Sequence, residues 1–159
     1  MRPRRRGVAG LRLLVVLIRG GEYLAAMAAL TPYLTLTGAA RSALEFYRDV
    51  FGGEIEVHTF ADFGRDDGEP EWVAHGILNG PVPLFAADAG PGEATLRAEG
   101  LLFALLGTGD ATTSTGWFRA LALSGDVLDA LQQRPWGDWD GQVRDRYGIT
   151  WLIGYHATP

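Results

Sequence analysis

One pattern of residues occurs twice along this chain, with a period of roughly 70 residues. In the first copy, an alternating strand-like run precedes a helical apolar spacing that starts at Ala39, and three further strand-like runs follow. Gly52-Gly53 is typical of a helix end with a left-handed cap, and Asn79-Gly80 predicts a hairpin. The predicted strands of this copy are 30–37, 54–60, 72–78 and 82–87.

The second copy follows a linker that begins near residue 89 and ends near Gly100. Residues 101–106 read as a strand of the buried type, and Asp110 is a candidate N-cap for a helix over 111–123. The pattern of 127–131 fits both a strand and a helix. The remaining strand-like runs of this copy are 142–144 and 150–155.

Two such copies predict an α+β fold made of two βαβββ modules within one domain over 27–159. We expect the first module over about 29–89 and the second over about 100–156.

Residues 1–26 are set aside because their charge differs from that of the rest. They carry a net charge of +5, whereas residues 27–159 carry −10. Their apolar run Leu13–Ile18 is shorter than the roughly 20 residues of a membrane span and the roughly 7–15 of a signal-peptide core. Three interpretations stay open: a weak signal peptide, a short amphipathic or disordered arm, or sequence upstream of a true start at Met27.

Composition excludes several kinds of chemistry. The sequence has no Cys, so disulfides, zinc fingers, iron–sulfur clusters and thiol nucleophiles are excluded. All 14 basic residues are Arg, which removes Schiff-base lysines and any P-loop lysine. An acidic body without a basic stripe argues against a nucleic-acid partner. We also expect no membrane partner and a cytoplasmic location.

Six short motifs stand in order along residues 30–155. They are Leu30-Thr-Pro-Tyr33, Ala43–Gly53, Val73-Ala-His-Gly76, Phe85-Ala-Ala-Asp88, Trp136-Gly137 and Asp145–Ile153. Their order and spacing resemble the vicinal oxygen chelate superfamily, which includes glyoxalase I, bleomycin-resistance proteins and extradiol dioxygenases, and within it the PhnB-like branch. The resemblance implies that the two modules enclose a cavity for a small molecule and that the chain forms a homodimer.

The same resemblance implies where a metal would be held. In metal-using members a His, Gln or Glu ligand lies on the first and the last strand of each module. Carried over one at a time, these positions fall on Tyr33, near 84–86, on Ala104 and on Leu152. Apolar side chains have no donor atom, and a phenol is a poor ligand for a divalent metal. We therefore expect no metal and no other cofactor.

Five residues are candidates for contact with a small-molecule ligand: Tyr33, His75, Asp88, Phe103 and Trp136. His75, in mid-strand, fits either a cavity-lining acid–base or hydrogen-bonding group or a partly buried structural His bonded to backbone. Asp88 fits a ligand contact, a partner that orients His75, or a turn cap after a strand. Tyr33 fits a cavity hydroxyl or a core Tyr, and Trp136 fits the cavity rim.

We expect no ligand contact from the other His residues or from Trp151. We expect His58 on the side opposite the helices, His156 in solvent, and Trp151 in the core on the helix side. The strand over 31–37 is a candidate edge for pairing between subunits.

The function that these observations favour is metal-independent binding of a small molecule. Two alternatives stay open. One is a lyase, isomerase or dioxygenase whose metal ligands are misplaced here, or which uses His75 and Asp88 without metal. The other is a structural module with a packed interior.

Overall fold

The computed structural model describes residues 30–157, so the interpretations of residues 1–26 lie outside the described residues. Residues from Thr31 onward form one compact unit. The strands of the first half are β1 (Tyr33–Leu36), β2 (Glu54–Thr59), β3 (Val73–Asn79) and β4 (Leu84–Asp88). Those of the second half are β5 (Leu102–Leu106), β6 (Asp126–Gln133), β7 (Trp139–Arg144) and β8 (Thr150–Tyr155). The helices are α2 (Ala40–Phe51), the short 3₁₀ turn η1 (Ala61–Phe63) and α3 (Ala111–Ala122).

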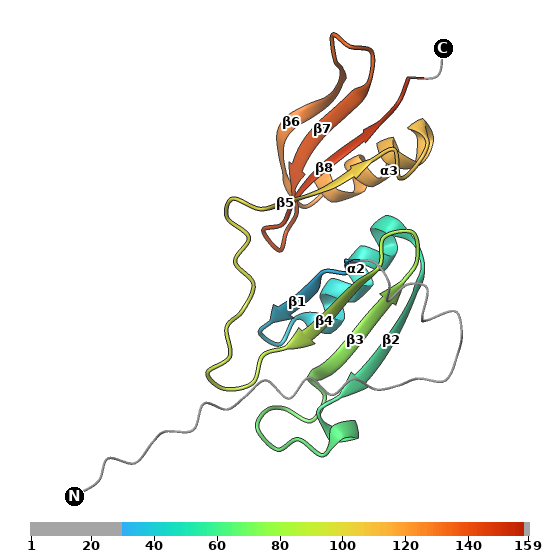
Figure 1. The fold of residues 1–159 in the computed structure, drawn as a ribbon. Coiled ribbons are helices and arrows are strands. Elements are labelled where there is room, and N and C mark those ends of the chain that lie inside the picture. The colour runs from blue at the N-terminus through green and yellow to red at the C-terminus, as the bar shows by residue number, and fades with distance from the viewer. Residues whose placement is uncertain (1–29, 158–159) are drawn as a thin grey trace, which may run out of the picture. The chain divides into compact units, whose positions relative to one another are not determined.

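Each half is a four-stranded mixed sheet with one long helix packed against it (Figure 1). The strand orders are β1-β4-β3-β2 and β5-β8-β7-β6. In both sheets the first strand is parallel to the last, and the other neighbours are antiparallel. The predicted α+β fold of two βαβββ modules is therefore confirmed.

The two helices form where the sequence predicts them. In α2 the buried residues are Ala40, Ala43, Leu44, Tyr47 and Phe51, which share one helical face. Gly52 follows with a positive φ of 81°, which favours glycine, and the helix ends there. At α3, the backbone N–H of Thr113 donates to Asp110 Oδ1 at 2.7 Å, which confirms Asp110 as the N-cap.

Both modules contribute to one apolar core. Trp151, on β8, is only 2% exposed and lies 5.9 Å from the ring of Tyr47 on α2, as measured between ring centroids. Phe51 contacts Trp117 of α3 edge-on at 5.5 Å. The predicted core position of Trp151 on the helix side is confirmed.

In the second module one strand resolves an open alternative and another differs from its prediction. The ambiguous run 127–131 lies within strand β6, which pairs with β7 through two register irregularities. The prediction that 101–106 is a buried-type strand is wrong, because Leu102 and Leu106 are 41% and 55% exposed. Only the alternate residues of β5, such as Phe103, pack against the core, so this edge strand is covered on one face.

No helix among residues 30–157 is long and apolar enough to cross a membrane.

Candidate functional site

The first sheet has one face packed against α2 and one face turned away from it. Leu34 and Leu84 are buried toward α2. Because side chains alternate along a strand, their neighbours Tyr33 and Phe85 project from the other side, and the two are register partners across β1 and β4. His75 lies on β3 two residues before the register partner of Phe85, so it shares this side. We call this side the open face of the first sheet.

Three rings on the open face contact one another. The ring centroids of Tyr33 and His75 are 5.7 Å apart, those of Tyr33 and Phe85 5.8 Å, and those of His75 and Phe85 5.4 Å. The hydroxyl of Tyr33 also lies 2.9 Å from His75 Nδ1, which is a hydrogen bond. Tyr33 is 41% exposed, so this three-ring cluster borders solvent.

The pKa values of the bonded pair move apart. Burial, followed by the negative charge of Glu93, raises the pKa of the Tyr33 phenol. Burial and then the nearby His58 lower the pKa of His75, while Glu56 opposes this change. Both groups are therefore neutral at pH 7, and when Tyr33 donates to Nδ1 the proton of His75 sits on Nε2, where it can be donated to a ligand.

Strand β2 extends the open face with a second polar pair. His58 is the register partner of His75. Its Nε2 atom lies 2.8 Å from Glu56 Oε1, and both side chains are partly exposed. The expectation that His58 lies opposite the helix is met, because its register partner His75 is on the open face.

The linker after β4 brings a further carboxylate to the cluster. Glu93 accepts a hydrogen bond from the backbone N–H of Gly90 at 2.8 Å, and its charge acts on both Tyr33 and Arg65. Arg65 itself is paired with Asp67 at 2.7 Å. Glu93 therefore adds negative charge that acts on Tyr33, while Arg65, on which it also acts, already has a carboxylate partner.

Asp88 does not belong to this cluster. It is 3% exposed, and its Oδ1 atom accepts from the backbone N–H groups of Ala39 at 2.8 Å and Ala40 at 3.0 Å. Its Oδ2 atom accepts from Val73 N–H at 2.9 Å. No side chain within α2 or directly before it caps the helix start, so Asp88 does so from the end of β4. Its role is structural, which removes the geometric basis for contact with a ligand or with His75.

Phe103 and Trp136 also lie apart from the cluster. Phe103 contacts the buried Trp151 at 5.5 Å, on the side of the second sheet that faces α3. Trp136 is 70% exposed in the turn between β6 and β7. His156, near the described C-terminal end, is exposed as expected and lies 3.0 Å from Asp138.

Of the five candidates that the sequence predicts, the structure brings two into contact, Tyr33 and His75. Sequence reasoning missed Phe85 and Glu93 as neighbours of this pair. Residues 84–87 are all apolar, so the sequence has no alternation that marks Phe85, and only the structure shows that Leu84 and Ala86 are the buried neighbours. No sequence signal placed Glu93, since the path of the linker is a tertiary feature.

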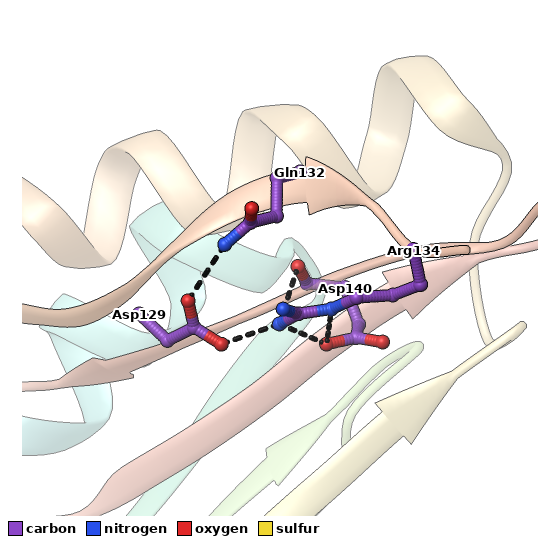
Figure 2. A network of polar contacts seen from close by, with 4 residues as sticks. All are labelled: Asp129, Gln132, Arg134 and Asp140. Carbon is purple, nitrogen blue, oxygen red and sulfur yellow. Dashed lines mark hydrogen bonds and ion pairs between the residues drawn. The ribbon is translucent and has the colours of Figure 1, made fainter.

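The second sheet carries a charged network on its side away from α3 (Figure 2). Arg134 donates from Nε to Asp140 Oδ1 at 2.9 Å and from Nη2 to the same oxygen at 2.6 Å, and Nη2 also pairs with Asp129. Gln132 donates to Asp129 at 2.8 Å. The network links both strands of the β6–β7 hairpin, and its single cation is held by two carboxylates.

A surface hollow of about 530 Å³ lies on α3 rather than at the ring cluster. Its lining is Ala111, Thr112, Thr115, Gly116 and Arg119. Short side chains on one helix offer few convergent polar groups, so we place the candidate site on the open face of the first sheet.

Comparison with known proteins decides the family. Residues 30–153 match the family described as the Glyoxalase/Bleomycin resistance protein/Dioxygenase superfamily. The chain belongs to this superfamily. Its similarity to Protein YjdN of Escherichia coli is 25% identity over 141 residues, covering 78% of this chain and 92% of YjdN.

Solved structures of this superfamily's fold include PhnB-like neighbours. The crystal structure of protein PA1353 from Pseudomonas aeruginosa is similar with a TM-score of 0.69 and 27% identity, covering 80% of this chain and 96% of that one. A PhnB protein from Bacillus cereus is similar with a TM-score of 0.61 and 21% identity, covering 79% and 98%. At that identity the second likeness shows the fold alone.

The metal positions of the superfamily can now be tested against the register. Tyr33 pairs with Phe85 across β1 and β4, and Ala104 pairs with Leu152 across β5 and β8. The equivalent strands of the two modules therefore present these four side chains: one phenol and three hydrocarbons. Such a set does not fit a divalent cation, which needs about three nitrogen, oxygen or sulfur donors from the protein. Among residues 30–157 no group of three His, Asp or Glu could hold a metal elsewhere.

Proposed function

We propose that this protein binds a small organic molecule on the open face of the first sheet, without a bound metal. The observation that carries the proposal is the three-ring cluster of Tyr33, His75 and Phe85, with its internal hydrogen bond at the border of solvent. Aromatic faces with a few convergent polar groups are typical of sites for planar or apolar ligands. The neutral Tyr33–His75 pair adds hydrogen-bonding groups that could orient such a ligand.

Metal independence rests on the side chains at the superfamily's ligand positions. The test is elemental analysis of the full chain purified without chelator, followed by calorimetric titration with zinc, nickel and manganese. We expect substoichiometric metal and no saturable binding. Near-stoichiometric metal, or saturable uptake, would overturn this part of the proposal and favour a metalloenzyme.

Ligand binding is tested by a thermal-shift screen of small planar and apolar compounds. Compounds that bind the cluster should stabilise the wild type but not His75→Ala. The matched control is His156→Ala, since the His156 side chain is 80% exposed and lies outside the cluster. Ligand shifts that are equal in all three proteins would place binding elsewhere.

A metal-free enzyme is the second candidate, and the hydrogen bond between Tyr33 and His75 favours it. Two groups with oppositely shifted pKa values are typical of acid–base pairs. Following each screened ligand by NMR over hours separates binding from turnover. Unchanged ligand supports binding alone, whereas product that forms in wild type but not in Tyr33→Phe supports the enzyme.

We also propose a homodimer. The edge of β1 is partly occupied, because Leu96 N–H donates to Thr35 C=O at 2.8 Å, and this argues against pairing of β1 between subunits. The exposed apolar side chains of edge strand β5, Leu102 and Leu106, are the better support for a subunit contact. Light scattering coupled to size exclusion should give twice the mass of the chain, and Leu106→Glu should lower it. A monomeric wild type would refute the proposal.

A further inference from the structure

The three-ring cluster is uncharged, but its surroundings are negative. Burial and Glu93 raise the pKa of Tyr33 further above neutral pH, and burial and His58 lower the pKa of His75, so neither ring is charged near pH 7. Glu56, which acts on His75, lies on β2 two residues from His58, the register partner of His75. The charge of Glu93 acts on Tyr33 from the linker.

The cation on which Glu93 acts, Arg65, is paired with a different carboxylate, whereas Glu56 is itself bonded to His58. Arg65 donates to Asp67 from Nε at 2.8 Å and from Nη2 at 2.7 Å, and its guanidinium lies 3.7 Å from the ring centroid of Phe60. His58 is bound to Glu56 at 2.8 Å. With His58 counted as neutral, Arg65, Asp67, Glu56 and Glu93 sum to a formal net charge of −2, and residues 27–159 carry −10. An anionic ligand would be repelled here, and a cationic one would be attracted.

The rings themselves offer a second reason for a cation. A π face attracts a cation within about 6 Å of its centroid, and the attraction grows where water is excluded. The three centroids of the cluster are 5.4–5.8 Å apart, so one ammonium group above the cluster could contact two rings at once. An aromatic body attached to that ammonium could stack on the remaining ring surface.

We propose that the ligand of the open face is an aromatic ammonium compound, with its charge over the rings of Tyr33 and Phe85 and toward Glu93. The inference rests on the proposed function, because it names the class of molecule that the same face would bind. The neutral pair of Tyr33 and His75 keeps the face free of positive charge that would oppose the ligand.

Three probes of similar size but different charge test the inference on the full chain. They are benzyltrimethylammonium, the neutral benzyl alcohol and the anionic phenylacetate, each titrated into the protein by NMR at low and high salt. We expect the ammonium probe to bind at least about tenfold more tightly than the other two, with weaker binding at high salt. Equal or tighter binding of the neutral or the anionic probe would overturn the inference.

Two variants and a control locate the effect. Glu93→Gln should weaken binding of the ammonium probe by about two- to fivefold and leave binding of the neutral probe unchanged. Glu99→Gln, an exposed position on the same linker, should change neither. Phe85→Leu should weaken binding of the ammonium probe more than binding of the neutral probe, because the substitution removes a π face and keeps an apolar side chain. An equal effect of Glu93→Gln and Glu99→Gln would also count against the inference.

The two proposals fail in different ways. If the ammonium probe does not bind at millimolar concentration while neutral or anionic compounds of the screen bind in a His75-dependent manner, the inference is wrong and the proposed function stands. If His75→Ala leaves every ligand shift unchanged, including that of the ammonium probe, both are wrong.

Discussion

Asp145 accepts a hydrogen bond from the hydroxyl of Tyr47 at 2.7 Å, across 98 positions of the chain. Tyr47 lies on α2 of the first module, and Asp145 begins the turn before β8 of the second. Asp145 is 4% exposed and also accepts from Trp151 Nε1 at 2.8 Å and from the backbone N–H groups of Tyr147 and Ile149. Four donors thus compensate a buried carboxylate, and one of them joins the two modules.

We expect Tyr47→Phe to lower the free energy of unfolding by about 1.5–3 kcal/mol, because a buried carboxylate loses a donor. The measurement is urea denaturation at neutral pH. Tyr147→Phe is the matched control, since its hydroxyl is 3.4 Å from Ser42 Oγ in an exposed contact, and it should change stability by less than about 0.5 kcal/mol. Equal losses in the two variants would contradict the role given to the Tyr47–Asp145 bond.

Asp88→Ala should cost more stability than the loss of an ordinary helix cap. It leaves the N–H groups of Ala39, Ala40 and Val73 without their acceptor, and we expect a loss of about 3 kcal/mol. Asp110→Ala, which removes the exposed cap of α3, should cost about 1 kcal/mol in the same assay. A smaller loss at Asp88 than at Asp110 would show that the first cap does not hold α2 in place.

His75 should make the protein less stable in mild acid. Its folded pKa lies below the unfolded value of 6.5, so the unfolded chain takes up the proton first as the pH falls. The free energy of unfolding should therefore decrease as pH falls through about 6.5, and level off below the folded pKa. Groups that face His75 from other elements are Tyr33, His58 and Glu56.

The check on His75 is denaturation at about pH 7 and about pH 5. His75→Phe should show a smaller loss between these conditions than the wild type, and His156→Ala should show the same loss as the wild type. A pH dependence that survives unchanged in His75→Phe would mean that another group carries it.

Two glycine substitutions should change the free energy of unfolding in opposite directions. A Cβ at Gly80 would lie 2.9 Å from the carbonyl oxygen of Gly52 and 2.9 Å from Gly53 Cα, so Gly80→Ala forces apart two backbone segments. We expect a loss of about 2 kcal/mol. Gly116, inside α3, has no atom within 4 Å of such a Cβ, and Gly116→Ala should add about 1 kcal/mol. Denaturation curves of both variants test the pair, and a stabilised Gly80→Ala would refute the close-approach argument.

The elements that the sequence predicts well are those whose pattern depends on neighbours along the chain. The buried face of α2, the cap of α3 by Asp110 and the core position of Trp151 all follow from local spacing. Strand β5 is the exception, because an apolar run does not say whether one face or both will be packed.

The composition of the candidate site depends on contacts between residues that are far apart in the sequence. Asp88 ends a strand as predicted, but its carboxylate caps a helix that starts 48 positions earlier. Phe103 and Trp136, predicted at the cavity, lie on a packed sheet side and in an exposed turn. Which side of a sheet is covered depends on where its helix packs, and that is not a property of one strand.

The sequence alone determined the two-module order, the helix limits and the lack of donor atoms at three of the superfamily's metal positions, because each depends on residue type and short-range spacing. Only the tertiary structure decided that Tyr33 and His75, 42 positions apart, share a hydrogen bond, and that Phe85 completes their cluster. The physical reason is that pairing of β1 with β4, the first strand of the module with its last, is fixed by the burial of the whole sheet against α2.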